Sequence, residues 1–524
     1  MILFYNGIID SIQSKATALA VDGDRIVAVS SDDEILNLAK PACEKINLHG
    51  KTIWPGLIDS HLHFEMFSQS LSQVKCETES IDQCLNLVKQ KALSVPGDEW
   101  IIGQGWNQNT WGTYGTASQL DSVTQGHPTF LADKSIHAAW VNTKAMSLAG
   151  INKQTPNPVG GAIQHDVNGE PTGILFENAV SLVESLIPAP SQSQILIWMT
   201  EGQKELHRLG LTGIHDFDRA SCFAALQTMR QNDELSLRVT KSIPVESLDE
   251  AIALGLKSGF GNEQLQIGSV KLFADGALGP QTAAMLAPYE NTTTNMGTLL
   301  LTADEIFEIG MKATSHGLSL AIHAIGDRAT NQVLNGLAMV RQYEITNGLI
   351  QQQHRIEHLQ LLHPDDLQKA RDLQIVASMQ PIHIISDMFT ADKHWGKRAK
   401  LAYAFASLLK QDTNLIFGSD APVESPNPFL GIRAAITRRR INGDPGENGW
   451  YLEEKISVDQ AKRAYSEVPA QISGLGKKLG QLKSGMLADL IILEKNPSEV
   501  DPDELINLTP EKVMANGNWV VNLG

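Results

Sequence analysis

Residues 54–64 read Trp-Pro-Gly-Leu-Ile-Asp-Ser-His-Leu-His-Phe, an apolar run that leads into a His-x-His pair. In an extended strand, side chains two residues apart point to the same side, so His61 and His63 are expected to converge. Neutral imidazole is a common zinc ligand, and two imidazoles from one strand end can bind the same ion. The alternative is that one or both histidines are hydrogen-bonded polar groups at a strand end.

Composition narrows the class of protein. The 524 residues predict two or three structural units, and 42% hydrophobic residues are typical of a soluble globular protein with no membrane partner. A formal net charge of −17, from 59 acidic and 42 basic residues, predicts no nucleic-acid partner, which would need a basic face. The four cysteines form no CxxC pair and the first residues lack a basic leader, so we expect a reduced protein of the cytoplasm.

Strand patterns occur at both ends of the chain. They lie at residues 17–21, 25–29, 488–493 and 513–521, with turn residues inside the first and last pairs. Neither end is large enough to bury a core alone. The prediction is therefore one small β-sandwich built from residues 1–53 and 477–524, with residues 54–476 inserted between its halves. An exposed edge of this sandwich would favour a homodimer.

The middle of the chain alternates between strands and helices. After the strand that precedes His61, apolar strand candidates follow at residues 211–217, 237–243, 268–273, 318–324, 354–359, 375–380 and 414–418. Helical segments lie between most of them, such as 303–315 and 328–341. Eight strands with intervening helices predict an α/β fold, a (β/α)₈ TIM barrel, whose active site lies at the carboxyl ends of the strands.

Residues 66–209 do not follow this alternation. A structureless loop of such length is improbable, so the segment is predicted to be an α/β insertion after the first barrel strand. Its glycine-, asparagine- and tryptophan-rich stretch at 100–111 includes Trp106. We expect the insertion to cover the active site, with Trp106 as a pocket wall. The alternative role of this segment is packing.

Polar residues are placed at the ends of the barrel strands. Lys271 lies in the fourth strand, His323 and His358 end the fifth and sixth, and Asp420 follows the eighth. Together with the two histidines of the first strand, they should meet at one end of the barrel. A single strand histidine is more often structural, but six such positions in one barrel indicate a site.

These residues stand within motifs that resemble a known family. The motifs lie at residues 55–63, 137–142, 169–173, 271–276, 323–327, 355–358, 418–422 and 482–490. On these motifs, and over nearly its whole length, the chain resembles the YtcJ-like branch of the amidohydrolase superfamily, which includes the N-substituted formamide deformylases. The resemblance does not identify a substrate.

The resemblance implies a metal site. Its ligands would be His61, His63, His323, His358 and Asp420, with Lys271 matching the lysine that binuclear members carboxylate. Two Zn²⁺ ions per chain, bridged by a carboxylated lysine, are expected, although histidine and carboxylate ligands also suit other divalent metals. A carbamate offers two anionic oxygens, whereas an ammonium offers no ligand atom. The alternative is an unmodified lysine paired with a carboxylate such as Asp275.

The expected activity is hydrolysis of a small-molecule, non-peptide, amide-type C–N bond by a metal-activated hydroxide. Asp420 would act as general base and then as general acid. A mononuclear deaminase of the same superfamily is the first alternative, which the lysine disfavours, and a catalytically silent regulatory homologue is the second. Three further residues are candidate substrate contacts besides Trp106: His137, by the branch resemblance, and Gln380 and His383, which follow the seventh strand. A surface or packing role for His137 is the alternative.

Overall fold

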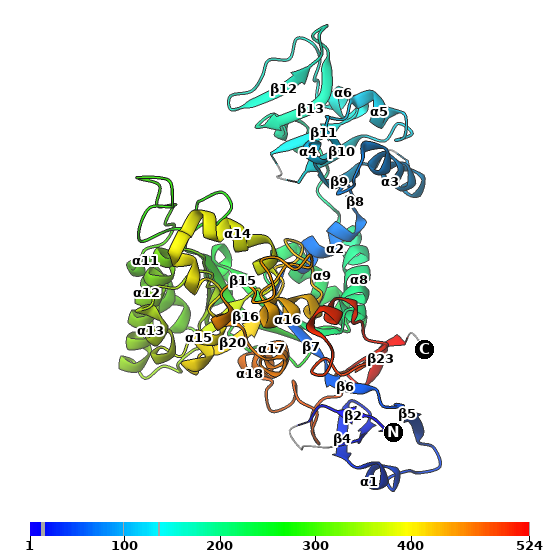
Figure 1. Cartoon of the computed structure of the whole chain (residues 1–524), viewed down its shortest axis with the longest axis vertical. Helices are drawn as coiled ribbons and strands as arrows, with labels where there is room; N and C mark the ends of the chain where they lie inside the picture. Colours follow the sequence, from blue (N-terminus) through cyan, green and yellow to red (C-terminus); the bar gives the residue numbers. More distant parts are fainter. Residues whose placement is uncertain (12–15, 98, 135–136, 523–524) are drawn as a thin grey trace. The chain divides into compact units, whose positions relative to one another are not determined.

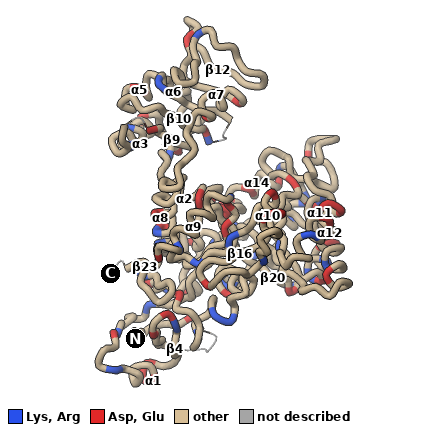
Figure 2. The backbone as a smooth tube through the Cα atoms, turned by 180° about the vertical axis from the view of Figure 1, so that it is seen from behind, with Lys and Arg blue, Asp and Glu red and all other residues tan. Residues whose placement is uncertain are grey.

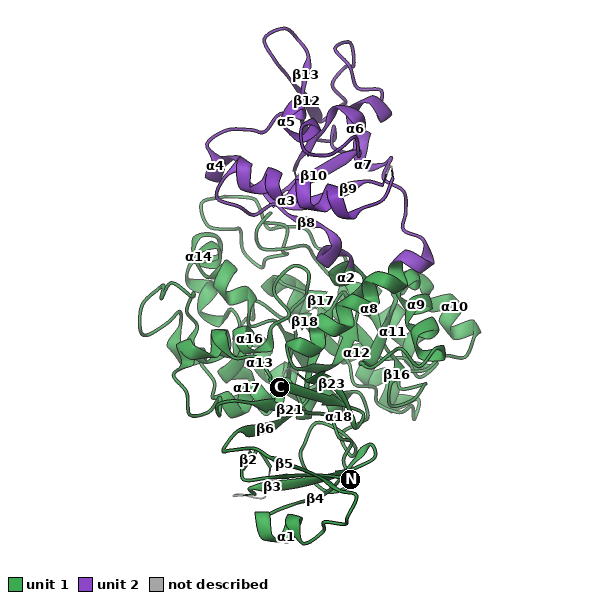
Figure 3. Cartoon of the chain, turned by 90° about the vertical axis from the view of Figure 1, so that its right-hand side faces the viewer, with its two compact units in different colours: residues 1–68, 195–524 green, residues 69–194 purple. Residues whose placement is uncertain are grey.

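The computed structural model of the chain describes residues 1–11, 16–97, 99–134 and 137–522. The chain divides into two compact units, one of Met1–Ser68 with Ile195–Gly524 and one of Gln69–Gln194 (Figure 3). The second unit is shorter than the predicted insertion because most of helix α8 (Gln192–Arg208) belongs to the first unit. In that helix, His207 bonds to Leu211 O and Ser236 Oγ of the first unit through its two ring nitrogens. Whether the second unit covers the site stays a prediction.

The first unit contains the predicted (β/α)₈ barrel, which is confirmed (Figure 1). Its eight strands are parallel and follow one another in chain order around the sheet. The ends of the first and last strands also meet, since Leu62 and Ala421 form a parallel bridge. The strands are β7 (Leu57–Leu62), β14 (Leu211–Asp216), β15 (Arg238–Pro244), β16 (Leu265–Phe273), β17 (Leu320–Ala324), β18 (Arg355–His358), β19 (Val376–Met379) and β20 (Asn414–Phe417).

Helices separate the barrel strands, and apolar residues on both faces of the strands explain why they form a buried parallel sheet. Strands β7, β14, β18 and β19 are buried at every position. The helices besides α8 are α2 (Phe64–Ser72), α9 (Ala220–Gln231), α10 (Leu248–Ala253), α11 (Ala303–Thr314), α12 (Asp327–Thr346), α13 (Asp366–Asp372), α14 (His383–Trp395), α15 (Phe405–Lys410), α16 (Pro428–Thr437), α17 (Val458–Ala464) and α18 (Glu467–Ile472). Short 3₁₀ turns, η1 to η4, lie at Val245–Ser247, Gly396–Leu401, Leu452–Glu454 and Pro502–Asn507.

Two small sheets are formed by the ends of the chain, and the second of them combines strands from both ends. One has the order β4-β3-β1-β5, and the other has the order β2-β6-β21-β22-β23. Side chains from both termini, including Phe4, Ile53, Leu490 and Met514, form one buried cluster. The strands are β1 (Ile2–Tyr5), β2 (Ile8–Ile9), β3 (Ala18–Asp22), β4 (Arg25–Ser30), β5 (Glu44–Asn47), β6 (Thr52–Pro55), β21 (Leu490–Leu493), β22 (Lys512–Ala515) and β23 (Asn518–Asn522), with helix α1 at Asp32–Leu36.

The second unit is an α/β unit with a mixed sheet in the order β12-β13-β11-β10-β9-β8. Its strands are β8 (Val74–Lys75), β9 (Ile101–Trp106), β10 (Thr129–Asp133), β11 (Ala138–Val141), β12 (Gly161–His165) and β13 (Pro171–Glu177). Its helices are α3 (Ile81–Ser94), α4 (Gln108–Trp111), α5 (Ala117–Asp121), α6 (Thr143–Leu148) and α7 (Ser181–Glu184).

Figure 2 shows basic positions interspersed with acidic ones along the backbone. Among the described residues, none of the helices combines the length and the apolar character needed to cross a bilayer.

Candidate metal centre and active site

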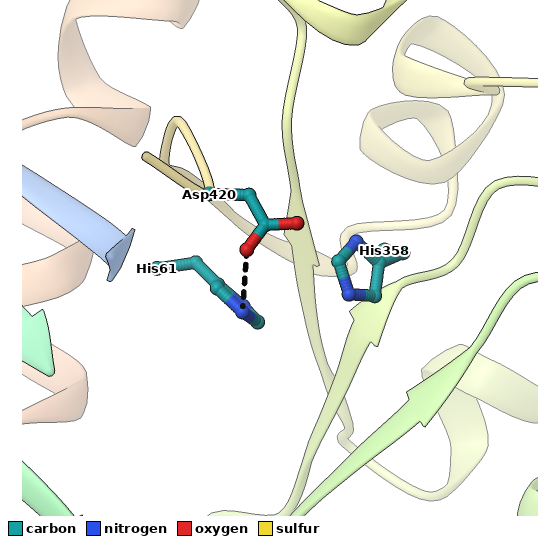
Figure 4. Close-up of side chains that lie close together, drawn as sticks. All are labelled: His61, His358 and Asp420. Atoms are coloured by element: carbon teal, nitrogen blue, oxygen red, sulfur yellow. Dashed lines mark ion pairs between the residues drawn. The ribbon is translucent and has the colours of Figure 1, made fainter. Parts of the chain in front are cut away.

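Three of the predicted ligands converge at the carboxyl ends of the barrel strands. Ligand atoms of His61, His358 and Asp420 all lie within 4.8 Å of one another (Figure 4). The Nε2 atoms of His61 and His63 lie 3.5 and 3.4 Å from Oδ1 of Asp420. The structure therefore brings both members of the His-x-His pair to one carboxylate, as the strand period predicts.

Backbone contacts between the first and last strands place Asp420. Its N–H donates to His61 O at 2.7 Å, and the N–H of His63 donates to Ala421 O at 2.9 Å. The strands approach so closely that a Cβ at Gly418 would lie 2.4 Å from the backbone nitrogen of His61. Asp420 and His358 have φ values of 61° and 69°, in the left-handed region. Residues held in such conformations cost energy and cluster at functional sites.

A buried carboxylate orients His61. Oε2 of Glu357 lies 2.6 Å from Nδ1 of His61, and Arg355 ion-pairs with the same carboxylate through Nε at 2.6 Å. Burial and the nearby Lys271 lower the pKa of His61 to about 4, so the ring is neutral at physiological pH. The Nδ1–H then donates to Glu357 and Nε2 keeps its lone pair for a metal. Carboxylates that fix a histidine tautomer in this way commonly support metal ligands.

His63 has a carboxylate partner on each side. Its Nδ1 lies 3.1 Å from Oδ1 of Asp218, and its Nε2 faces Asp420. Burial acts against the cation, but the two carboxylates prevail and raise the pKa of His63 to about 10. Without a metal, the ring therefore carries a proton at neutral pH. A metal ion that replaced the Nε2 proton would again put a cation beside Asp420.

Lys271 lies on β16 in an environment that disfavours its cation. Nζ is buried without a hydrogen-bond partner among the described residues, 4.8 Å from the ring centroids of both Phe217 and Phe273. Burial lowers the pKa of Lys271 to about 8. Asp275, the alternative partner of this lysine, instead accepts the backbone N–H groups of Ala284, Ile325 and Gly326. The geometry thus leaves Nζ available for modification.

His323 completes the set from β17. Its Nε2–H donates to Gly276 O at 3.0 Å, which leaves Nδ1 as the free ring nitrogen. Its ring centroid lies 4.5 Å from that of His358. Burial lowers the pKa of His323 to about 4 and that of His358 well below its usual value, so both rings are neutral.

The donor chemistry fits a divalent metal. Lys271 Nζ and the Nδ1 atoms of His323 and His358 are buried polar atoms with no partner within the described part of the chain. Buried polar atoms are normally satisfied, so three such atoms beside one carboxylate need an explanation. Metal ligation of the two rings and modification of the amine supply one.

The four candidate substrate contacts lie in different environments. His383, the first residue of α14, lines the same cavity as the ligands, and its Nε2 lies 3.2 Å from Ser419 O. Gln380 is fully buried, with Nε2 3.5 Å from Ser378 O and Oε1 without a partner among the described residues, and its contact with a substrate stays a prediction. In the second unit, Trp106 is also fully buried, with its indole N–H bonded to Leu131 O, because apolar residues of the sheet and helix α3 enclose it. Its predicted role as a pocket wall therefore needs correction. His137 is exposed and pairs with Glu177.

Two carboxylates of the site were not among the predicted residues. Glu357 precedes a predicted ligand within its strand, and Asp218 follows the end of β14. Their position at strand ends was the available signal. A further group, Asp216, Asp218 and Cys222, has metal-like spacing, but the ammonium of Lys241 lies 2.7 Å from Asp216 and already neutralises it.

A cavity of about 350 Å³ contains the site. It is lined by all six predicted metal-site residues, and its other lining residues include the apolar side chains Phe273, Leu278 and Ile325. A second cavity of about 400 Å³ shares His63, Lys271 and Phe273 with it and extends to Met66 and Arg219. Together these cavities offer room for a small molecule beside the ligand cluster.

Comparison with known proteins identifies the family. The sequence pattern of the Amidohydrolase family matches residues 44–521. This chain belongs to the amidohydrolase family. It is 31% identical, over 95% of its length and 96% of the relative's, to a Bacillus subtilis protein, YtcJ, whose name provisionally assigns it to the amidohydrolases. The N-substituted formamide deformylase of Arthrobacter pascens is 26% identical over 97% of this chain and 95% of its own. The predicted YtcJ-like branch is thereby confirmed.

A solved structure agrees with this placement in the amidohydrolase family. A metal-dependent hydrolase from Pyrococcus furiosus, described as uncharacterized, is 29% identical, with a TM-score of 0.78 over 95% of this chain and all of its own. The family and this neighbour class the chain as a metal-dependent hydrolase.

Proposed function

We propose that this amidohydrolase hydrolyses an amide-type C–N bond of a small molecule, with divalent metal, preferably zinc, at the barrel mouth. The observation that carries the proposal is the convergence of His61, His358 and Asp420 within 4.8 Å, in a cavity that also holds Lys271. Imidazole and carboxylate donors in this combination are typical of catalytic zinc sites.

Two groups of side chains would hold two ions. His61, His63 and Asp420 form one group and His323 and His358 the other, with Lys271 between them as a carbamate. Its unpartnered Nζ and lowered pKa support this modification, because only the neutral amine reacts with CO₂. A divalent metal bound here would lower the pKa of water and polarise a substrate carbonyl.

The residues of the chain would then handle the proton. The neighbouring histidines, acting against burial, hold the pKa of Asp420 well below its usual value, so its carboxylate is ionised at neutral pH. It can accept the proton of the attacking water and return it to the leaving nitrogen. Glu357 and Asp218 keep the imidazoles of His61, in β7, and of His63, directly after it, in a fixed orientation during these transfers. Phe273 and Ile325 add apolar surface to the lining of the cavity.

An amide-type C–N bond is favoured over the deaminase alternative for two reasons. The unpartnered Lys271 suits a bridged pair of metals, which a mononuclear deaminase does not need. The relative from Arthrobacter pascens is an N-substituted formamide deformylase, which supports this bond class for the present chain.

The test combines metal analysis with substrate screening. Protein prepared with zinc and bicarbonate is analysed for metal content and screened against N-formyl and N-acyl amines, simple esters and amino-heterocycles. Release of amine from an amide, lost in Asp420→Asn with fold and metal retained, supports the proposal. Asp372→Asn, at the exposed end of α13, removes an equal charge as a control. Turnover of amino-heterocycles alone would favour the deaminase. No turnover of any compound tested would favour the silent homologue.

A further inference from the structure

One wall of the metal cavity carries a carboxylate that the proposed chemistry does not use. Asp387, on α14, lines the cavity together with Gln360, which follows β18. Both residues share the cavity with the metal ligands but are not part of the ligand set.

The hydrogen bonds of Asp387 involve only one of its oxygens. Oδ2 accepts the hydroxyl of Tyr403 at 2.5 Å and Nε2 of Gln360 at 3.2 Å. No described residue donates to Oδ1, and no described lysine or arginine forms an ion pair with the carboxylate. The buried Tyr403, whose pKa burial raises well above its usual value, remains a donor. Asp387 is partly exposed, so a cation bound in the cavity can pair with this carboxylate.

Gln360 adds a second acceptor to this wall. Its amide orientation follows from its neighbours, because Nε2 must face the acceptor Asp387 and the hydroxyl oxygen of Tyr403, 2.7 Å away. Oε1 is then left buried without a partner in the described structure. Neither of these two acceptor oxygens has a donor among the described residues, and Tyr403 helps to hold both side chains in place. Together they form a subsite that suits a ligand with a positively charged donor group.

We propose that Asp387, with Gln360, is a specificity determinant that selects substrates carrying an ammonium group on the amine side of the scissile amide. This inference rests on the proposed amide hydrolysis for the identity of the reacting bond, but the recognition itself does not depend on turnover. Charge-assisted hydrogen bonds to a carboxylate are about twice as strong as neutral ones. An analogue with a methyl group in place of the ammonium leaves both acceptors unpaired, and such a site rejects it.

The experiment uses matched pairs of small amides on the full-length protein with its metal. N-(2-Aminoethyl)formamide and N-(4-aminobutyl)formamide are compared with their neutral isosteres N-propylformamide and N-pentylformamide. We expect kcat/KM of the wild type to favour a cationic member over its isostere by at least about tenfold. In Asp387→Asn this preference should fall to near unity, chiefly through a higher KM for the cation.

A control variant and a binding measurement separate the possible outcomes. Asp392→Asn removes the same charge from the same helix, where Asp392 is exposed and bonds to Trp450 Nε1 and Tyr451 Oη, so it should keep the preference. Calorimetry with N-(2-aminoethyl)methanesulfonamide and N-propylmethanesulfonamide, which resist hydrolysis, measures recognition without turnover.

Tighter binding of the cationic sulfonamide than of the neutral one by the wild type, but not by Asp387→Asn, supports the subsite. This holds even if no formamide is hydrolysed, and in that case only the proposed function fails. Equal binding of the two sulfonamides to the wild type overturns the inference, whether or not Asp387→Asn folds. A cation preference that persists in a folded Asp387→Asn overturns it as well.

Discussion

Removal of CO₂, or of Lys271 itself, should remove metal from the site. Burial lowers the pKa of this lysine from 10.5 to about 8. At pH 7 the neutral fraction of the amine is then about one tenth, compared with about 0.03% for an ordinary lysine, a gain of about 300-fold. The neutral amine attacks CO₂ to form an N–C bond and releases one proton, which gives an anionic carbamate able to bridge two cations.

The assay follows the carbamate and the metal together. Protein loaded with ¹³C-bicarbonate and zinc should show one carbamate carbon signal, absent from a Lys271→Met variant of similar side-chain volume. Metal content should fall in that variant and in wild-type protein reconstituted without CO₂. Lys241 is an internal comparison, because Asp216 outweighs burial and raises its pKa, so it stays a cation and should not be carboxylated.

A distinct result would refute this reasoning. If the metal content is the same with and without CO₂, and the same in Lys271→Met, the lysine does not bridge metals. A carbamate signal that survives in Lys271→Met would place the modification elsewhere.

Four other predictions concern the metal site and one buried ion pair outside it. Asp420→Asn should lower turnover by about 10²–10⁴-fold in steady-state kinetics, because the proton acceptor is lost. Glu357→Gln should weaken metal binding by roughly 10–100-fold in chelator competition, because the partner of His61 Nδ1 loses its charge. Metal affinity should rise by at least about tenfold per pH unit from pH 6 to 9, since His63, with a pKa of about 10 in the metal-free protein, must lose its proton on binding, and carboxylation of Lys271 below its pKa of about 8 releases a further proton. Arg238→Leu should lower the free energy of unfolding by about 3–5 kcal/mol in urea titrations, because Asp489, now 2.7 Å from Arg238 Nε, would be a buried charge without its cation.

Each of these has a contrary result. Full activity in Asp420→Asn would exclude it as the proton acceptor, and unchanged metal affinity in Glu357→Gln would exclude support through His61. A pH-independent affinity would mean that His63 is not a ligand. An unchanged urea midpoint in Arg238→Leu would mean that its ion pair with Asp489 adds no net stability. Asp372→Asn serves as the folding control for the carboxylate variants.

The sequence predicted the barrel and the six strand-end residues because both depend on local pattern. Alternation of apolar strands with helices indicates parallel strands, and parallel strands bring their carboxyl ends together, whatever the details of packing. Element bounds were less exact, as β16 begins at Leu265 rather than at residue 268. The placement of Trp106 was wrong for a related reason. Tryptophan suits a core and a pocket equally well, and only the fold of the second unit decides between them.

The carboxylates around the ligands could not be assigned from pattern, because their roles depend on partners distant in the chain. Glu357 meets His61 across 296 positions, and Asp218 meets His63 across 155. Asp387 is the clearest case, since on sequence it is one polar residue of an amphipathic helix, which usually faces solvent. Its proposed role follows only from the folded structure, in which Tyr403 and Gln360 donate hydrogen bonds to one oxygen and no described residue donates to the other. The proposed metal ligands are therefore accessible to sequence reasoning through strand ends, whereas the side chains that we propose to select the substrate are defined by which hydrogen bonds the folded protein leaves unmade.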